Sequence, residues 1–322
     1  MNTCEGGFFG VGAMKAYIDL QTARLKGHRI PSLPLTPQTN DGLEVADCQI
    51  WSSSGSLLAL TSLHGAPISD ALWGRFTRSI GHARPGDFYA GAAGAIPVLG
   101  LVGPFRPDAR DTLLLLQRSV EGELARLLHR AERGESVAIG FGHGLAGCLV
   151  SFEMARVLIG SHETGLRHRA IEILKSSAIA TPDGPVWQTN SDDRSLLLKT
   201  HGVCTGGPGI CLAAILGLRY SEDTAYEELL SVALETVPLQ GGDHSFCCGV
   251  AGRAEVLIEL YRTTEDESYL VAARQLLNGL AVTDPTDETW KTGALGPTFA
   301  RVRLEHPHEI DLPGLPRSLQ PW

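Results

Sequence analysis

A short phrase that ends in the pattern Gly-x-x-Gly recurs along the chain, while the two residues in front of that pattern change. It reads Gly142-His143-Gly144-Leu145-Ala146-Gly147 near the middle of the sequence. It returns as Cys204-Thr205-Gly206-Gly207-Pro208-Gly209, and then as Cys247-Cys248-Gly249-Val250-Ala251-Gly252. Turns of this kind, with small residues in the pattern Gly-x-x-Gly or close to it, end at seven places: Gly10, Gly55, Gly94, Gly147, Gly209, Gly252 and Gly296. Such self-similarity is typical of a repeat architecture.

One pair of units fixes the length of the repeat. Cys204 and Cys247 are 43 residues apart, and the polar segments 221–226 and 264–269 keep the same offset. Each unit begins with an apolar helix after the glycines, as expected for a helix that is buried on most sides. An amphipathic helix belongs to each unit as well, most clearly over 112–133, where apolar residues recur at spacings of three and four. The sequence therefore predicts an all-α protein of about seven helical hairpins.

The repeat alone leaves the arrangement of the hairpins open, because seven hairpins can build either an open solenoid or a closed ring. In a closed ring the glycine turns would surround one central opening, and the residues in front of the glycines would face one another. Strand signals are sparse, and proline-rich connections separate the units. We expect a single domain over residues 1–322.

Charge and composition exclude several classes of protein. The net charge of −9 and the absence of a basic block argue against nucleic-acid binding, which requires neutralisation of phosphates. No apolar run is long enough to span a membrane, and the N-terminus lacks the pattern of a signal peptide. We therefore expect a cytoplasmic protein without a membrane span. The odd number of seven cysteines argues against a disulfide framework and leaves thiols, metal ligands or core residues.

Three cysteines at the repeat turns form a candidate metal site. Cys204 and Cys247 occupy equivalent positions, and Cys248 follows directly. Zinc binds thiolate and imidazole ligands, and a catalytic zinc keeps one coordination position open. The alternative is that these residues are small, buried and apolar in behaviour, as many cysteines are. Their placement at equivalent turns favours the interpretation as ligands of Zn²⁺.

His143 is the candidate for proton transfer. His143 directly precedes Gly144, as Cys248 directly precedes Gly249, so in a closed ring its imidazole would approach the same opening. Imidazole exchanges protons near neutral pH. Asp87, just before the glycines of the third turn, could orient that imidazole or move a proton, although a carboxylate there is also typical of a helix start. His201 and His244 each precede a repeat cysteine by three residues, and we interpret them as equivalent structural residues.

These phrases resemble those of the lanthionine synthetase C-like family, the cyclases of lanthipeptide biosynthesis. The family's first phrase, His-Gly followed by a small residue and glycine, is similar to 143–147. Its second, Cys-x-Gly-x-Pro-Gly, matches 204–209, and its third, usually Cys-His-Gly-x-x-Gly, reads Cys-Cys-Gly-Val-Ala-Gly at 247–252. Segments around 293–316 are similar to the closing repeat of the family. The resemblance spans nearly the whole chain.

The resemblance implies an α/α toroid, a double ring of helices with a zinc ion at its mouth. Two cysteines and a histidine hold that ion in the family. Residue by residue this gives Cys204, Cys247 and Cys248, with Cys248 in the usual place of the histidine. A branch of the bifunctional class II enzymes has a similar Cys-Cys-Gly variant. Three thiolates would leave the site at a charge of −1, so a thiolate held there should be more nucleophilic.

The resemblance also assigns the proton-transfer residues. His143 corresponds to the family's acid/base histidine and Asp87 to its carboxylate. The residue after the first zinc cysteine is often aromatic or histidine in relatives, whereas this chain has Thr205. A basic residue found shortly before that cysteine corresponds to Lys199.

The implied function is that of a zinc-dependent lanthipeptide cyclase. Such an enzyme adds peptide cysteine thiols to dehydroalanine or dehydrobutyrine and forms lanthionine or methyllanthionine thioether rings. Its substrate is a dehydrated precursor peptide. Because no dehydratase, kinase or lyase region is recognisable, partner proteins would dehydrate that peptide, unless the chain is one domain of a larger synthetase. The alternatives are a non-catalytic toroid that binds a modified peptide or a partner enzyme, and an α/α-barrel hydrolase or terpenoid enzyme, which would need acids that we do not find.

Overall fold

A computed structural model describes residues 25, 67–89, 91–161, 165–182, 184–187, 201–221, 223–237, 243–280, 295–312, 315–317, 319 and 321. A first set of helices starts at the glycine turns: η1 (Ala92–Ala95) with α4 (Ile96–Val102), α6 (Leu145–Ile159), α8 (Gly207–Ser221), α10 (Val250–Thr264) and α12 (Leu295–Glu305). A second set alternates with the first: α3 (Asp70–His82), α5 (Ala109–Glu132), α7 (Gly165–Ser176), α9 (Ala225–Leu234) and α11 (Glu267–Asn278). The short helix η2 (Gly103–Phe105) links α4 to α5.

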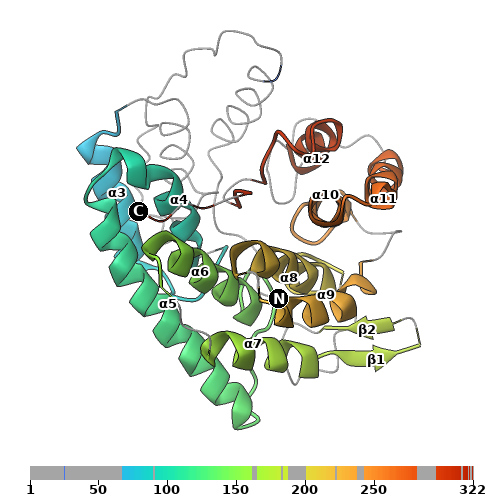
Figure 1. Ribbon diagram of the computed structural model, residues 1–322, viewed down its shortest axis with the longest axis horizontal. Helices are drawn as coiled ribbons and strands as arrows, with labels where there is room; N and C mark the ends of the chain where they lie inside the picture. Colours follow the sequence, from blue (N-terminus) through green and yellow to red (C-terminus); the bar gives the residue numbers. More distant parts are fainter. Residues whose placement is uncertain are drawn as a thin grey trace.

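The two sets differ in burial as the sequence predicted. Nearly every residue of α6, α8 and α10 is buried, so these are inner helices. Helix α5 instead buries one face and exposes the other, and its buried residues include the predicted apolar series Leu113, Leu116, Val120, Leu124 and Leu127. In Figure 1, α6, α8 and α10 lie nearer the middle of the molecule than α5, α7 and α11. The predicted alternation of inner and outer helices is confirmed for the described residues.

Successive units pack side by side. Inner helices contact one another in the order α4, α6, α8, α10, α12, and each of α6, α8 and α10 also packs against the outer helix that follows it. The outer helices α5, α7 and α9 contact one another in the same order. Figure 1 shows these elements following an arc. The predicted turns that end at Gly10 and Gly55 lie outside the described residues.

The last glycine of each phrase is required by a close approach of the backbone. A β-carbon at Gly147, Gly209 or Gly252 would collide with the carbonyl oxygen six residues earlier in the chain. Those oxygens belong to Phe141, Val203 and Phe246, respectively. The first turn of each inner helix therefore rests directly on the turn before it, which explains why the glycines recur while other residues change.

The longest interval between turns contains the two-stranded sheet of the described chain. Strands β1 (Ile179–Thr181) and β2 (Gly184–Val186) pair in antiparallel fashion. Trp187 follows the sheet, is fully buried and donates a hydrogen bond from Nε1 to the carbonyl oxygen of Leu174 at 2.7 Å. The interval is thus anchored to α7 by its tryptophan.

The C-terminal segment crosses back over the inner helices. The hydroxyl of Tyr220, in α8, donates to the carbonyl oxygen of Pro316 at 2.9 Å, and Leu319 packs against the core. Figure 1 shows this segment running from α12 towards the side that carries α3 and α4. Among the described helices, none combines the length and the apolar character needed to cross a membrane.

Candidate functional site

Backbone hydrogen bonds tie four successive glycine turns together. The N–H of Tyr89 donates to the oxygen of Gly142 at 3.0 Å, the N–H of Gly142 to Cys204 at 2.9 Å, and the N–H of Cys204 to Cys247 at 3.1 Å. These four residues are equivalent in the repeat, because each stands two positions before the glycine that opens a Gly-x-x-Gly turn: Gly91, Gly144, Gly206 and Gly249. We refer to these four residues as the turn ladder. The ladder brings side chains that are far apart in sequence to one place without any contribution from those side chains.

The predicted acid/base pair is brought together beside the turn ladder. Nδ1 of His143 lies 3.1 Å from Oδ1 and 3.0 Å from Oδ2 of Asp87. Asp87 is itself held in place, because its Oδ1 accepts the backbone N–H of Tyr89 at 3.0 Å. A carboxylate only accepts hydrogen bonds, so Nδ1 is the donor and Nε2 is the atom left to exchange protons. The imidazole is 38% exposed and the carboxylate only 12%, so the pair presents its histidine to solvent.

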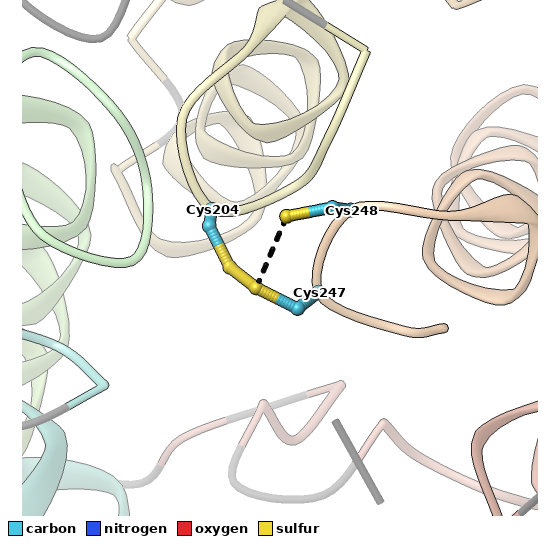
Figure 2. A group of neighbouring side chains, drawn as sticks. All are labelled: Cys204, Cys247 and Cys248. Carbon is cyan, nitrogen blue, oxygen red and sulfur yellow. Dashed lines mark hydrogen bonds between the residues drawn. A yellow bond between two sulfur atoms is a disulfide. The ribbon is translucent and has the colours of Figure 1, made fainter. Parts of the chain in front are cut away.

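The three predicted cysteines also converge. Their sulfur atoms all lie within 4.8 Å of one another, and Figure 2 shows the side chains meeting from two neighbouring turns. Cys204 and Cys247 are buried, whereas Cys248 is exposed and its thiol donates to the sulfur of Cys247 at 3.4 Å. The turn that carries Cys248 is fixed by its own backbone N–H, which donates to Oγ of Ser245 at 3.2 Å.

Cys204 and Cys247 are joined by a disulfide, which corrects the expectation that the cysteines remain thiols. The physical reason is the turn ladder, which holds their Cα atoms 5.5 Å apart, within the range at which disulfides form. Spacing along the sequence does not reveal this proximity. The pairing is compatible with metal binding only after reduction to two thiols.

The reduced cysteines suit a tetrahedral zinc ion. With Zn–S bonds of about 2.3 Å, two thiolates on one zinc lie roughly 3.8 Å apart. The three sulfurs all lie within 4.8 Å of one another, so after reduction of the disulfide they are close enough to share one ion. Three cysteines, of which Cys248 is exposed to solvent, would match the number of protein ligands of a catalytic zinc, which keeps its fourth position for another ligand.

The remaining candidates lie away from this group. His201 is exposed and His244 half-buried, and the metal-ligating group found in the described chain includes neither. Thr205 is half-buried next to Cys204, and Lys199 lies outside the described residues. Two further cysteines, Cys148 and Cys211, are buried in inner helices, where burial raises the pKa of their thiols well above the usual value. They are core residues.

Tyr89 belongs to the site, although sequence reasoning missed it. Its side chain is almost completely buried, and its ring stands edge-on to the imidazole of His143, with centroids 5.8 Å apart. Burial raises the pKa of Tyr89 well above 10, and the nearby Cys248 thiolate would raise it further, so the phenol stays protonated. The signal was present in the repeat, since Tyr89 holds the position equivalent to Cys204 and Cys247.

Comparisons with known proteins agree with this geometry. A family model described as "Lanthionine synthetase C-like protein" matches residues 71–297. A solved structure described as "Nisin cyclase" is similar, with a TM-score of 0.55 and 14% sequence identity, and the match covers 81% of this chain and 77% of that chain. No curated protein sequence matches the chain. The structural similarity confirms the predicted α/α toroid.

Proposed function

The chain belongs to the lanthionine synthetase C-like family, and we propose that it is a zinc-dependent enzyme that closes thioether rings in a dehydrated precursor peptide. The observation that supports this proposal is the proximity of two groups on one turn ladder. A histidine–aspartate pair stands on the turns of Asp87 and His143, and three cysteine sulfurs stand on the turns that follow. Lanthionine formation needs both a thiolate and a proton donor.

The proposed metal ligands are Cys204, Cys247 and Cys248. These three residues would hold the zinc ion, and the chemistry that zinc would supply there is a lower pKa of the substrate thiol, so that its thiolate would be available at neutral pH. Cys204 and Cys247 are buried, whereas Cys248 is exposed, so a peptide could approach the site from the side of Cys248. Three thiolates carry one more negative charge than two thiolates and an imidazole, which favours a more nucleophilic substrate sulfur.

His143 would supply the proton that completes the addition. The substrate thiolate attacks the β-carbon of a dehydroalanine or dehydrobutyrine, a carbon–sulfur bond forms, and the electron pair of the double bond moves to the α-carbon. Nε2 of the protonated imidazole then donates its proton to the α-carbon. One proton leaves the substrate thiol and one reaches the α-carbon, so the addition needs no external reactant. Asp87, hydrogen-bonded to Nδ1, keeps the tautomer and stabilises the imidazolium.

The disulfide sets a condition for this activity. Cys204 and Cys247 bind zinc only after two electrons and two protons from a thiol reductant have converted the disulfide into two thiols. We therefore propose that the enzyme works in the cytoplasm, where thiols are kept reduced. We also propose that residues 1–322 form one cyclase domain, and that separate dehydratase or kinase and lyase proteins prepare its substrate.

The decisive experiment combines metal analysis with an assay on a dehydrated peptide that contains one cysteine. Reduced wild-type protein should carry about one zinc per chain and close the ring. Cys204→Ala should lose both zinc and ring closure. His143→Asn should keep zinc but lose about 10²- to 10⁴-fold in rate, the usual contribution of a general acid.

Cys211→Ala is the matched control, because Cys211 is a buried cysteine that lies outside the sulfur group. It should change neither zinc content nor rate by more than a small factor. A Cys204→Ala protein that still binds zinc and closes rings would refute the proposed ligands. Wild-type protein that binds zinc but never closes a ring would refute the proposed activity.

A further inference from the structure

The four positions of the turn ladder carry unrelated side chains: a tyrosine, a glycine and two cysteines. At Gly142 the missing side chain makes room for the ring of Tyr89. A β-carbon added there would lie 2.8 Å from Cδ2 of Tyr89 and 3.2 Å from Cα of Cys204. The tyrosine ring therefore lies against the turn of His143, at a position where it is also close to the turn of Cys204.

The ring is held firmly in that place. Tyr89 is 1% exposed, its N–H donates to both Gly142 and Asp87, and its ring packs at 6.3 Å against the ring of Phe141. Its hydroxyl oxygen is also buried. A side chain enclosed in this way does not reach a peptide substrate, so any effect on the reaction must pass through a neighbour.

The neighbour is the imidazole of His143. Its Nδ1 is bound by Asp87. Contacts at this one ring atom do not by themselves fix the tilt of the imidazole plane. The Tyr89 ring meets the imidazole at an interplanar angle of 87°, an edge-on packing that aromatic rings favour. Together the carboxylate and the aromatic ring define one orientation for an imidazole that is otherwise exposed.

We propose that Tyr89 is a positioning residue of the cyclase, whose aromatic ring aims the imidazole of His143 at the space in front of the Cys204, Cys247 and Cys248 sulfurs. This inference rests on the proposed function. The property that matters is the ring, because the hydroxyl is buried away from substrate. Small errors in aim are costly in general, since a displacement of about 1 Å can reduce a rate by roughly 10²-fold.

The test compares Tyr89→Phe with Tyr89→Leu, because the first keeps the ring and the second removes it. Tyr89→Leu should lower kcat by about 10- to 100-fold with little change in KM, as expected when geometry rather than binding is lost. Tyr89→Phe should remain within about threefold of wild type. Zinc content should be the same in all three proteins.

A spectroscopic measurement on the protein alone gives a second readout. The ring of Tyr89 should shift the NMR signals of the His143 imidazole protons, and this ring-current shift should persist in Tyr89→Phe and disappear in Tyr89→Leu. Should Tyr89→Leu fail to fold, Tyr89→Met removes the ring while its flexible chain fills the space.

The outcomes separate the two proposals. A Tyr89→Leu protein with wild-type kcat, or an unchanged His143 signal, refutes the positioning role. A Tyr89→Phe protein as slow as Tyr89→Leu also refutes it, because the hydroxyl would then be responsible. Absence of cyclisation by the wild-type protein refutes the cyclase proposal itself, and the NMR shift still decides whether the ring orients His143.

Discussion

The two ends of the inner helices are held together by different forces. At the starting end, backbone hydrogen bonds of the turn ladder and close contacts at glycines join one unit to the next. Further along the same helices, buried carboxylates and arginines make the connections. Glu153 in α6 pairs with Arg156 and with Arg167 of α7, each at 2.6 Å. Both ends unite neighbouring units, but the starting end does so through backbone groups and glycines, and the other end through charged side chains.

A second charge cluster of the described chain surrounds Glu259 of α10. This fully buried carboxylate pairs with Arg219 of α8, Arg262 of its own helix and Arg303 of α12, so it links three inner helices. Burial alone would raise the pKa of Glu259, but the attraction of the three arginines outweighs it and holds that pKa well below its usual range. The carboxylate is charged at all physiological pH values.

The comparison explains where chemistry can reside in this fold. Positions in the turn ladder can carry tyrosine, glycine or cysteine because the backbone itself fixes their placement. At the charge clusters each side chain compensates a neighbour, so the exchange of one member leaves a buried charge without its partner. The starting end is therefore the part of each repeat that is able to acquire ligands and acid/base groups, while the charge clusters maintain the ring.

The strongest test of this difference is Glu259→Gln, which removes one charge and keeps the shape. The three buried arginines would lose the carboxylate that they share. Because buried charges would then be left uncompensated, we expect the free energy of unfolding to fall by about 3–5 kcal/mol. Urea unfolding of the reduced, metal-free protein measures the change. Glu132→Gln is the control, because the Glu132–Arg169 pair is exposed and screened by solvent, so its loss should change the stability little. Equal losses in the two variants would contradict a special role for the buried cluster.

Gly209→Ala tests the opposite end of α8. The added β-carbon would collide with the carbonyl oxygen of Val203, directly before Cys204, and we expect a loss of about 1–3 kcal/mol in unfolding free energy. Because the collision displaces the turn that carries Cys204, zinc affinity should fall as well. Gly122→Ala on α5 has nothing within 4 Å of its new β-carbon and should stabilise the helix by about 0.5–1 kcal/mol. An unchanged zinc affinity in Gly209→Ala would show that the glycine contacts do not place the ligands.

The difference between the two ends also explains what the sequence could predict. The glycine phrases repeat because the backbone contacts repeat, so the inner helices, the cysteine group and the approach of Asp87 to His143 could be predicted. Tyr89 could not be recognised because the third turn carries neither cysteine nor histidine in the two positions before its first glycine, so its residue types indicate no metal or acid/base chemistry. The disulfide was missed because spacing along the chain gives no distance between two turns.

The charge clusters could not be predicted for a different reason. Glu259 and Arg303 lie in apolar inner helices and are 44 residues apart, and Glu153 lies 14 residues from Arg167. The carboxylates do not recur at one register position from repeat to repeat, so the repeat gives no signal for them. Which arginine meets which carboxylate depends on the packing angles of the helices, and these follow only from the assembled structure.

Glu255 offers the finest test, because it shares Arg303 with Glu259 and is the weaker of the two acids. Burial raises the pKa of Glu255 to about 7, against an ordinary value of 4.5, since Arg303 only partly offsets burial and Glu259 adds repulsion. The folded protein thus binds this proton more tightly than the unfolded chain. The contribution of Glu255 to stability is complete below pH 4.5 and is lost as the pH rises towards 7.

Wild-type protein should therefore lose up to about 1.4 kcal/mol of unfolding free energy per pH unit through this group, the limit for one proton. Glu255→Gln cannot titrate, so the difference between the wild-type and variant stabilities should change between pH 5 and pH 7 and level off above about pH 7.5. Urea unfolding of both proteins across this pH range measures the difference in their stabilities. In that difference the titration of all other groups cancels. If the stabilities of the wild-type protein and of Glu255→Gln changed with pH in parallel, Glu255 would be ionised over the whole range. The charge cluster would then hold two charged carboxylates rather than one.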